Sequence, residues 1–513
     1  MSWKVGNEMN ETTIFGPPGT GKTTTLINIV KEKIHKGTEP NKIGFFSFSK
    51  KAATEARDRA FLDLELDSKN LEYFRTLHSL AFKWLGLSTN DVFRGADFNE
   101  LGRLVGIDFR SAQTLNIEEG PLFSIGAGGD KYMSIIQMAR VKQIPVLEEL
   151  KNIDDFAVSK QQLLLIEDTF TKYKKMKNKL DFIDMIEKFI EEGTSPKFDV
   201  LIIDEAQDLV PLQWKMVKEV LVPNSKEVFY AGDDDQAIYG WMGVKVEDFL
   251  NSSENKLVLK QSYRVPSDIH GMADRLIRKV KIRESKKWQP QKEKGFVSWY
   301  RDILDVDLSS GEWLILARTN YIVNKVCLRL KEDGHLFWRE GTGWSISPNV
   351  LNGIEVWLKL CKKQDLTSED LKTFSKLIHP NMITKSGRKV MASLESDQTY
   401  TLQDLVDNCG LKANSETPWQ SVLKVSEQET AYIVSVRRRG EKILTEAPRI
   451  RVSTIHKAKG GEADNVALLL DSTKACTEYW DQDPEHRVFY VGMTRAKKTL
   501  HLIESQQQYG FEL

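Results

Sequence analysis

The chain has 513 residues, of which 41% are hydrophobic and 28% charged, a composition typical of soluble globular proteins. This length exceeds what one hydrophobic core serves, so roughly three to four domain-sized units are expected. Lys+Arg and Asp+Glu both total 73, which gives a formal net charge of +0. The balance excludes a globally basic protein, although a local basic path for nucleic acid remains compatible with it.

The four cysteines lie far apart and form no C-x-x-C pair. Their spacing argues against a zinc ribbon, an iron–sulfur cluster or a disulfide framework, and it suits a reducing compartment. The first residues, MSWKVGNEMNE, lack the apolar core of a signal peptide. No stretch comes near the roughly 18 apolar residues that a membrane span needs. We therefore expect a cytoplasmic protein, or a nuclear one if its source has a nucleus, with no membrane partner.

A phosphate-binding pattern opens the chain. A short β-prone run, Thr12–Phe15, leads into GPPGTGKT (Gly16–Thr23), which fits G-x-x-x-x-G-K-[ST] at every fixed position, and apolar residues at helical spacing follow. Glycines let the backbone wrap a phosphate chain so that N–H groups and a helix N-terminus face the negative charge. Lys22 is expected to hold the β- and γ-phosphates, and the Thr23 hydroxyl to ligate Mg²⁺. The alternative is an ordinary Gly-Pro turn before a helix. The predicted nucleotide-binding residues of this loop are Gly16, Pro17, Pro18, Gly19, Thr20, Gly21, Lys22, Thr23 and Thr24.

A second strand, Ile43–Ser49, is followed by a helix that begins near Lys51. Such alternation predicts a parallel sheet. In FRTLHSLA (Phe74–Ala81), Thr76 and His78 sit at an expected strand-to-helix junction.

Residues 82–195 lose the strand–helix alternation and become rich in helix patterns, which predicts an inserted helical domain. A Gly-rich interruption lies at Ser124–Asp130. The basic run Lys172–Lys179 is more typical of a solvated helix face than of a binding site.

The alternation returns at FDVLIIDEAQDL (Phe198–Leu209), a buried strand that delivers two carboxylates at its C-terminal end. Asp204 is expected to hold Mg²⁺, and Glu205 to polarise the water that attacks the γ-phosphate. The alternative is that DEAQ only starts a helix.

A third buried strand begins at Glu227, within EVFYAGDDDQAIYGW, and ends in three aspartates and Gln236. A glutamine at such a strand end can sense a γ-phosphate by hydrogen bonding. Tyr239 and Trp241 offer flat surfaces on which bases stack. A place for Trp241 in the core is the competing interpretation.

LKQSYRVPSDI (Leu259–Ile269) carries Tyr263 and Arg264, the latter a candidate charge clamp for a phosphate. A helix rich in Lys and Arg is expected at Arg275–Lys287. A strand within Glu312–Asn320 leads into another helix.

Residues 340–448 are again mostly helical, with a basic patch at Arg437–Arg439. The segments Val452–Leu470 and Arg487–Ile503 each predict a strand next to polar and cationic residues.

Eight of these segments resemble, in their order and in their residues, the motifs of the UvrD/Rep/PcrA-type helicases of superfamily 1 (SF1A). They are GPPGTGKT, FFSFSKKAATEARDR, FRTLHSLA, VLIIDEAQDL, FYAGDDDQAIYGWMG, LKQSYRVPSDI, VSTIHKAKGGEADNV and FYVGMTRAKKTLHL.

The resemblance implies an α/β fold with two RecA-like parallel-sheet motor domains, each carrying an inserted helical subdomain. The expected boundaries are 1–81 and 196–258 for the first motor domain, 82–195 for its insertion, 259–339 and 449–513 for the second motor domain, and 340–448 for its insertion.

The resemblance also implies roles for individual residues, with ATP and Mg²⁺ as cofactors. The expected catalytic residues are Lys22, Asp204, Glu205, Gln236, Arg264 and Arg495, the two arginines reaching the γ-phosphate from the second motor domain. Tyr263 aligns with the residue that stacks on adenine, and Glu462 with one near the ribose. The residues that align with a single-strand track are Phe48, Thr76, His78, Tyr239, Trp241, Thr454 and His456.

The family pattern is not kept everywhere. Residues 1–11 lack the glutamine of the family's adenine-selecting segment, Met242 stands where a basic residue is usual, and Gly461 and Ala463 depart in the segment that begins at Val452.

The function implied is an ATP-dependent 3′→5′ DNA helicase, a monomer acting on single-stranded and tailed duplex DNA at the nucleoid. Two alternatives stay open. One is a single-strand translocase that strips proteins with little unwinding, and the other is a nucleotide-gated DNA-binding switch. The pathway served and the protein partners are not specified by these residues.

Overall fold

A computed structural model describes residues 10–64, 68–109, 129–152, 158–395, 398–440, 448–477 and 482–513. The chain forms two compact units. The first unit is Met1–Phe296 with Glu478–Lys498, and the second unit is Val297–Thr477 with Thr499–Leu513. The predicted α/β class is confirmed, while the four-part domain boundaries stay a prediction.

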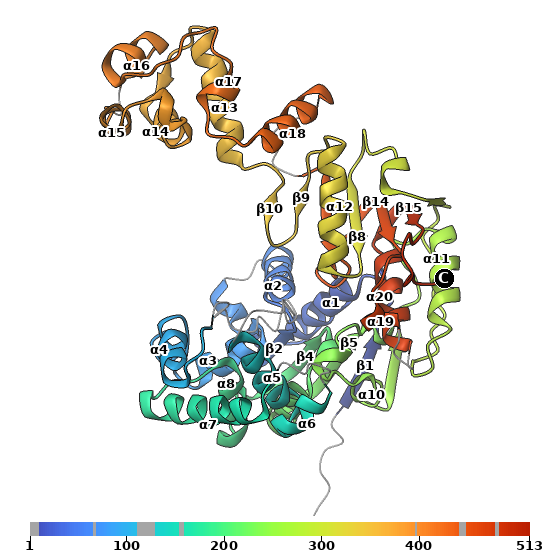
Figure 1. Cartoon of the computed structure of the whole chain (residues 1–513). Helices are drawn as coiled ribbons and strands as arrows, with labels where there is room; N and C mark the ends of the chain where they lie inside the picture. The colour runs from blue at the N-terminus through green and yellow to red at the C-terminus, as the bar shows by residue number, and fades with distance from the viewer. Residues whose placement is uncertain are drawn as a thin grey trace, which may run out of the picture. The chain divides into compact units, whose positions relative to one another are not determined.

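The first unit is built on a six-stranded sheet in the order β3-β2-β4-β5-β1-β6, whose neighbouring strands run parallel (Figure 1). Long buried runs such as FDVLIID are typical of parallel strands covered on both faces. The strands are β1 (Asn10–Phe15), β2 (Ile43–Ser47), β3 (Phe74–Arg75), β4 (Phe198–Asp204), β5 (Ser225–Gly232) and β6 (Asn255–Val258).

The first unit also contains helices, and the helix after β1 shares a core with the strands. Leu26 and Val30 of the first helix pack with Phe45 and Ile202 of the sheet. The helices are α1 (Lys22–His35), α2 (Lys50–Leu64), α3 (Leu77–Trp84), α9 (Pro211–Met216), α10 (Val246–Leu250), α11 (Ser267–Ile277) and α20 (Asp483–Met493).

An inserted helical bundle has a core of its own around Phe93, whose ring lies 4.6 Å from that of Phe98 and 5.0 Å from that of Phe170. The bundle comprises α4 (Ala96–Val105), α5 (Gly129–Lys142), α6 (Val146–Lys151), α7 (Lys160–Lys177) and α8 (Phe182–Glu192). Most of the predicted Gly-rich interruption lies outside the described residues, and Gly129 begins α5.

The lysine run falls on α7 and its exit, as predicted, but the solvated interpretation is wrong for Lys174. Lys174 is buried, and its Nζ lies 2.6 Å from Asp181 Oδ2 and 2.5 Å from Asp184 Oδ2. The capping box that begins α8 supplies both carboxylates, so the lysine joins two helices of the insertion.

The second unit holds most of a seven-stranded sheet in the order β10-β9-β13-β8-β14-β15-β7. Strand β8 pairs in parallel with β13 and β14, and β9 and β10 form an antiparallel edge. Its strands are β7 (Phe296–Tyr300), β8 (Trp313–Ala317), β9 (Trp338–Arg339), β10 (Gly343–Trp344), β13 (Ile450–Thr454), β14 (Ala463–Leu469) and β15 (Ala496–Ile503), and its helices are α12 (Asn320–Glu332) and α19 (Lys474–Thr477).

A second helical core packs around Trp357, whose ring stacks on Phe374 with centroids 6.2 Å apart and an interplanar angle of 9°. It contains α13 (Pro348–Cys361), α14 (Ser368–Leu377), α15 (Lys385–Ala392), α16 (Leu402–Cys409), α17 (Trp419–Val422) and α18 (Glu427–Arg438), with a small sheet of β11 (Leu366–Thr367) and β12 (Thr399–Tyr400). The predicted helical character of residues 340–448 is therefore confirmed for the described part.

One prediction of local structure is wrong. The helix expected over Arg275–Lys287 ends at Ile277, and the rest of that segment is irregular because its polar groups bind aspartates elsewhere in the chain. The segment Arg487–Ile503 contains the expected strand, β15, from Ala496 onward, and its first residues belong to the buried helix α20. A short apolar run fits a buried helix as well as a strand, and only its packing decides.

Across the described ranges, no helix combines the length and the apolar character required to cross a bilayer.

Candidate active site

The P-loop is a backbone cradle at the end of β1. Gly19 and Gly21 have φ of 72° and 76°, values that side chains disfavour, and Gly21 is the N-cap of α1. Thr20 closes the turn, because its amide and its hydroxyl donate to Pro17 O at 3.2 Å and 2.8 Å. The start of α1 can therefore face a phosphate chain, as the sequence predicts.

Lys22 meets both carboxylates at the end of β4. Its Nζ donates to Glu205 Oε1 at 2.5 Å and lies 3.6 Å from Asp204 Oδ1. Burial by itself lowers the pKa of Lys22, but the two carboxylates raise it above its ordinary value, so the ammonium stays charged. Burial raises the pKa of Asp204 to about 6, against the attraction of Lys22. A bound phosphate chain would compete with Glu205 for this ammonium.

Glu205 has a φ of 53°, in the left-handed region that non-glycine residues rarely occupy. Its amide donates to Asp204 Oδ1 at 2.9 Å, which helps to hold the turn. Backbone strain of this kind clusters at functional sites. The turn aims the carboxylate at Lys22.

Gln207 is a site residue that the sequence analysis missed. Its side chain is buried, and Nε2 donates to Glu205 Oε2 at 2.6 Å while Oε1 accepts from the amide of Asp233 at 3.0 Å. A Cβ added to Gly232 would lie 2.2 Å from Gln207 Oε1, so this glycine makes room for the contact. The amide thus joins the ends of β4 and β5. Its position in the sequence, two residues after the expected water-activating carboxylate, could have indicated this role.

Gln236 and Arg495, predicted to sense and stabilise the γ-phosphate, contact each other. Arg495 Nη2 donates to Gln236 Oε1 at 2.7 Å, and Gln236 Nε2 donates to Asp233 Oδ2 at 2.7 Å. Arg495 is 2% exposed, and its Nε also donates to Val491 O of α20 at 3.0 Å. The structure therefore connects the end of β5 to the end of α20.

Tyr263 and Arg264 lie against the P-loop. The amide of Tyr263 donates to Gly19 O at 2.8 Å, and a Cβ on Gly19 would stand 2.3 Å from Cβ of Arg264. The Tyr263 side chain is 75% exposed and open to stacking. Ser262, which the sequence analysis missed, donates its hydroxyl to Pro18 O at 2.7 Å.

Both predicted arginine fingers lie in the first compact unit, together with the P-loop. The family resemblance implies instead that they come from a second motor domain.

Three predicted DNA-binding aromatics form a row. The ring of Phe48 stacks on Tyr239 at 5.6 Å and 28°, and Tyr239 meets Trp241 edge-on at 6.3 Å and 78°. Phe48 and Tyr239 are buried, whereas Trp241 is half-buried and reaches the surface. Trp241 thus combines packing against Tyr239 with an accessible face.

Thr76 and His78 begin α3, as predicted. The Thr76 hydroxyl caps the helix by accepting from the amide of Ser79 at 3.2 Å. Burial lowers the pKa of His78 to about 4, against the opposing effect of Asp181, and its ring lies 6.1 Å from that of Phe182. His78 is therefore neutral near pH 7, suited to hydrogen bonding or stacking rather than to pairing with a phosphate charge.

The remaining predicted residues lie in the second unit. Thr454 ends β13, and its hydroxyl accepts from the amide of Lys457 at 3.3 Å in a turn that contains His456. The backbone oxygen of Glu462 accepts from Arg451 Nη2 at 2.7 Å. Their roles toward DNA and ribose stay predictions.

The expected magnesium ligands are Thr23, half-buried at the start of α1, and Asp204, buried at the end of β4. No cluster of three or more His, Cys, Asp or Glu suited to a metal occurs among the described residues. Mg²⁺ beside a nucleotide needs only one or two carboxylates, because phosphates and water complete its shell. The donor set therefore fits Mg²⁺ bound together with ATP.

A P-loop, a strand-end carboxylate pair and a glutamine–arginine contact define a P-loop ATPase. The family described as UvrD/REP helicase N-terminal domain matches residues 4–256, and the UvrD-like helicase C-terminal domain matches residues 151–507. The chain belongs to the UvrD-like helicase family, a family of ATP-dependent DNA helicases.

Several relatives share this similarity along most of the chain. A probable DNA helicase II homolog of Mycoplasma pneumoniae is 23% identical over 97% of this chain and 82% of its own length. The ATP-dependent DNA helicase Rep of Buchnera aphidicola subsp. Schizaphis graminum is 23% identical over 98% of this chain and 92% of its own. The match to a probable DNA helicase II homolog of Mycoplasma genitalium is 26% identical but spans only 46% of that relative.

Glu205→Gln should leave ATP binding intact and slow hydrolysis by about 10²- to 10⁴-fold, because an amide cannot accept the proton of the attacking water. Equilibrium binding of ATP and single-turnover hydrolysis test this expectation. The matched control is Glu227→Gln, which removes a carboxylate paired with Lys33 at 2.5 Å in the same unit. Normal hydrolysis by Glu205→Gln would remove Glu205 as the base.

The low pKa of His78 predicts a pH-dependent contribution to stability. In the unfolded chain His78 becomes protonated below its ordinary pKa of 6.5, whereas in the native state it stays neutral down to about pH 4. The stability contributed by neutral His78 is therefore complete above about pH 6.5 and declines toward pH 4.

We expect the difference in free energy of unfolding between wild type and His78→Gln to narrow from about pH 7.5 to about pH 5. Urea unfolding at several pH values measures it, with His35→Gln at an exposed position as control. A difference that is constant across this range would contradict the assignment.

Proposed function

We propose that this chain is an ATP-driven motor that translocates 3′→5′ along single-stranded DNA and unwinds tailed duplexes. The observation that supports it most is the continuous set of contacts from Lys22 through Glu205 and Gln207 to Asp233, Gln236 and Arg495. A glutamine and an arginine joined to the catalytic carboxylate suit hydrolysis better than passive nucleotide binding. The direction is the one expected of the UvrD side of superfamily 1.

Hydrolysis follows from the placement of these side chains. Lys22 would bind the β- and γ-phosphates, and Thr23 and Asp204 would hold Mg²⁺, whose charge would offset that of the phosphates. Glu205 orients the attacking water and accepts its proton. Gln236, Arg264 and Arg495 donate to the γ-phosphate oxygens, where negative charge must be stabilised during transfer. The family resemblance assigns adenine stacking to Tyr263 and contact with the ribose to Glu462.

DNA movement is coupled to the nucleotide through the segment after β5. Tyr239 follows Gln236 by three residues and leads to Trp241, so a shift of Gln236 on loss of the γ-phosphate reaches the aromatic row. The family resemblance also assigns Thr76, His78, Thr454 and His456 to contacts with the single strand. Bases held by stacking are released and regripped as the nucleotide state changes, and about one base advances per ATP.

The expected substrates are single-stranded and tailed duplex DNA, handled by a monomer in the cytoplasm at the nucleoid. The balanced total charge implies that phosphate contacts come from local groups rather than from a globally basic surface.

Strand displacement from duplexes with either a 3′ or a 5′ single-stranded tail tests the proposal. With ATP, Mg²⁺ and fixed salt, we expect displacement only from the 3′-tailed duplex, because the motor loads on the tail and moves toward its 5′ end. Displacement only from the 5′-tailed duplex would refute the direction. Hydrolysis stimulated by single strands without displacement would instead favour a translocase that strips proteins.

Trp241→Ala should weaken single-strand binding by about 1–3 kcal/mol if its accessible face stacks a base. Fluorescence anisotropy with a labelled oligonucleotide measures the loss. Trp84→Ala, at an exposed position outside the predicted track, is the control. An unchanged affinity together with a lowered melting temperature would restore the core interpretation.

A further inference from the structure

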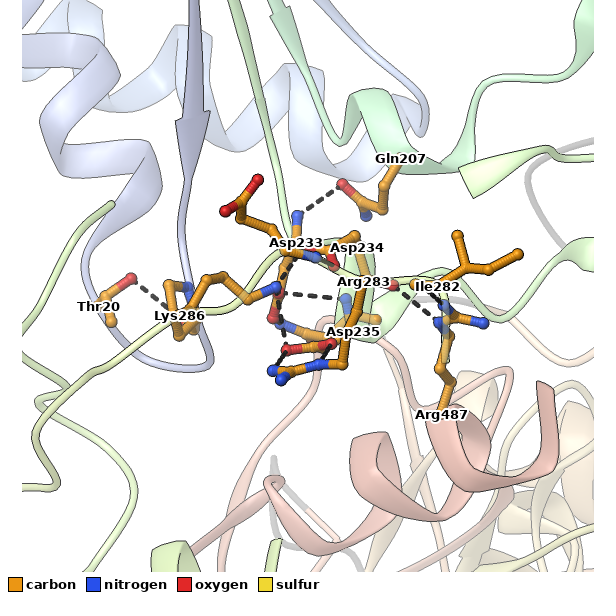
Figure 2. A network of polar contacts seen from close by, with 12 residues as sticks. Thr20, Gln207, Asp233, Asp234, Asp235, Ile282, Arg283, Lys286 and Arg487 are labelled. Carbon is orange, nitrogen blue, oxygen red and sulfur yellow. Dashed lines mark hydrogen bonds and ion pairs between the residues drawn. The ribbon is translucent and has the colours of Figure 1, made fainter. Parts of the chain in front are cut away.

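A buried charge cluster lies beside the active site. Asp233, Asp234 and Asp235 follow β5 directly, and each is 0% exposed. Lys286 and Arg283, from the irregular segment after α11, face these carboxylates (Figure 2). We call these five residues the aspartate cluster.

Lys286 binds all three aspartates. Its Nζ lies 2.8 Å from Asp233 Oδ1 and 2.9 Å from Asp235 Oδ2, and it also donates to Asp234 Oδ1. Arg283 binds Asp235 through two bonds of 2.8 Å and 2.7 Å. Lys286 is therefore the cation shared by the whole turn.

The charge on Lys286 is retained despite complete burial of the side chain. Burial by itself lowers the pKa of Lys286, but the three carboxylates raise it above its ordinary value. An ion pair in this environment contributes little net stability compared with an apolar replacement. The main effect of these ion pairs is to fix the positions of three carboxylates around one ammonium.

Asp233 is connected to the candidate active site by two series of hydrogen bonds. Its Oδ2 accepts from Gln236, which in turn accepts from Arg495. Its amide donates to Gln207, which donates to Glu205. Both paths end on groups assigned to the γ-phosphate or to the attacking water.

A second tie joins the same segment to the helix that precedes Arg495. Arg487 of α20 donates to Asp234 O at 3.0 Å and to Ile282 O at 2.5 Å. Figure 2 shows Arg487 reaching the turn and the segment together. The aspartate cluster thus fixes α20 relative to the end of β5.

We propose that Lys286 is a positioning residue for ATP hydrolysis that acts through Asp233 on Gln236 and Arg495. The inference rests on the proposed roles of those two residues. The ammonium of Lys286 binds the three aspartates, so its effect on the site passes through them.

Lys286→Met removes the charge and keeps a long side chain. Released from the ammonium, Asp233 no longer fixes Gln236, so we expect kcat for DNA-stimulated hydrolysis to fall roughly 10- to 100-fold with KM for ATP little changed. Lys256→Met is the matched control. Its Nζ lies 5.7 Å from the Phe15 ring, close to the 5.6 Å of Lys286, but its ion-pair partner is Glu284. We expect wild-type kcat from the control.

Two further variants distinguish a positioning role of Lys286 from a purely structural one. Asp234→Asn combined with Lys286→Met restores the net charge of the aspartate cluster, so the double variant should keep the wild-type melting temperature. Asp233 still lacks its ammonium in this variant. We therefore expect its kcat to stay low. Lys286→Met added to Arg495→Ala should cause no further loss, because both act along one path.

Wild-type kcat in folded Lys286→Met, recovery of kcat in the charge-restored pair, or independent losses from Lys286→Met and Arg495→Ala would each overturn the inference. Normal hydrolysis by Arg495→Ala would instead refute the proposed role of that arginine. The two failures are therefore distinguishable.

Discussion

The buried carboxylate of Asp233 joins three parts of the first unit that are far apart in the chain. Its side chain accepts from Gln236 and Lys286, and its amide donates to Gln207. A carboxylate without exposure requires compensation by cations and hydrogen bonds. The groups that satisfy this requirement are the same groups that align the predicted γ-phosphate sensor, the water-activating carboxylate and an arginine.

The ion pair of Lys22 with Glu205 relates this arrangement to nucleotide binding. The ammonium is bound to the carboxylate that is expected to activate water, and the phosphate chain competes for it. A bound phosphate chain would change the partners of Glu205, and the contacts of Gln207 would pass that change to Asp233. Such a chain of contacts gives a physical route from the nucleotide to Gln236 and onward to the aromatic row at Tyr239 and Trp241.

The local sequence pattern was sufficient to predict a segment whose conformation depends on residues within that segment. The strand β4 was predictable because a continuous apolar run ending in two carboxylates is typical of a buried parallel strand. The P-loop was predictable because its glycines meet a backbone requirement within a few residues. The helix expected to Lys287 failed after Ile277, because Arg283 and Lys286 bind aspartates that lie far upstream.

The sequence by itself determined the family, the α/β class and the helical character of the described parts of residues 82–195 and 340–448, and it predicts catalytic residue types at the strand ends. Tertiary structure decided which buried groups pair. Gln207 bridges two strand ends, Ser262 holds Pro18, and Lys286 binds the turn after β5. No local periodicity encodes these contacts, because each joins segments that meet only when the sheet assembles and buries their polar groups away from water.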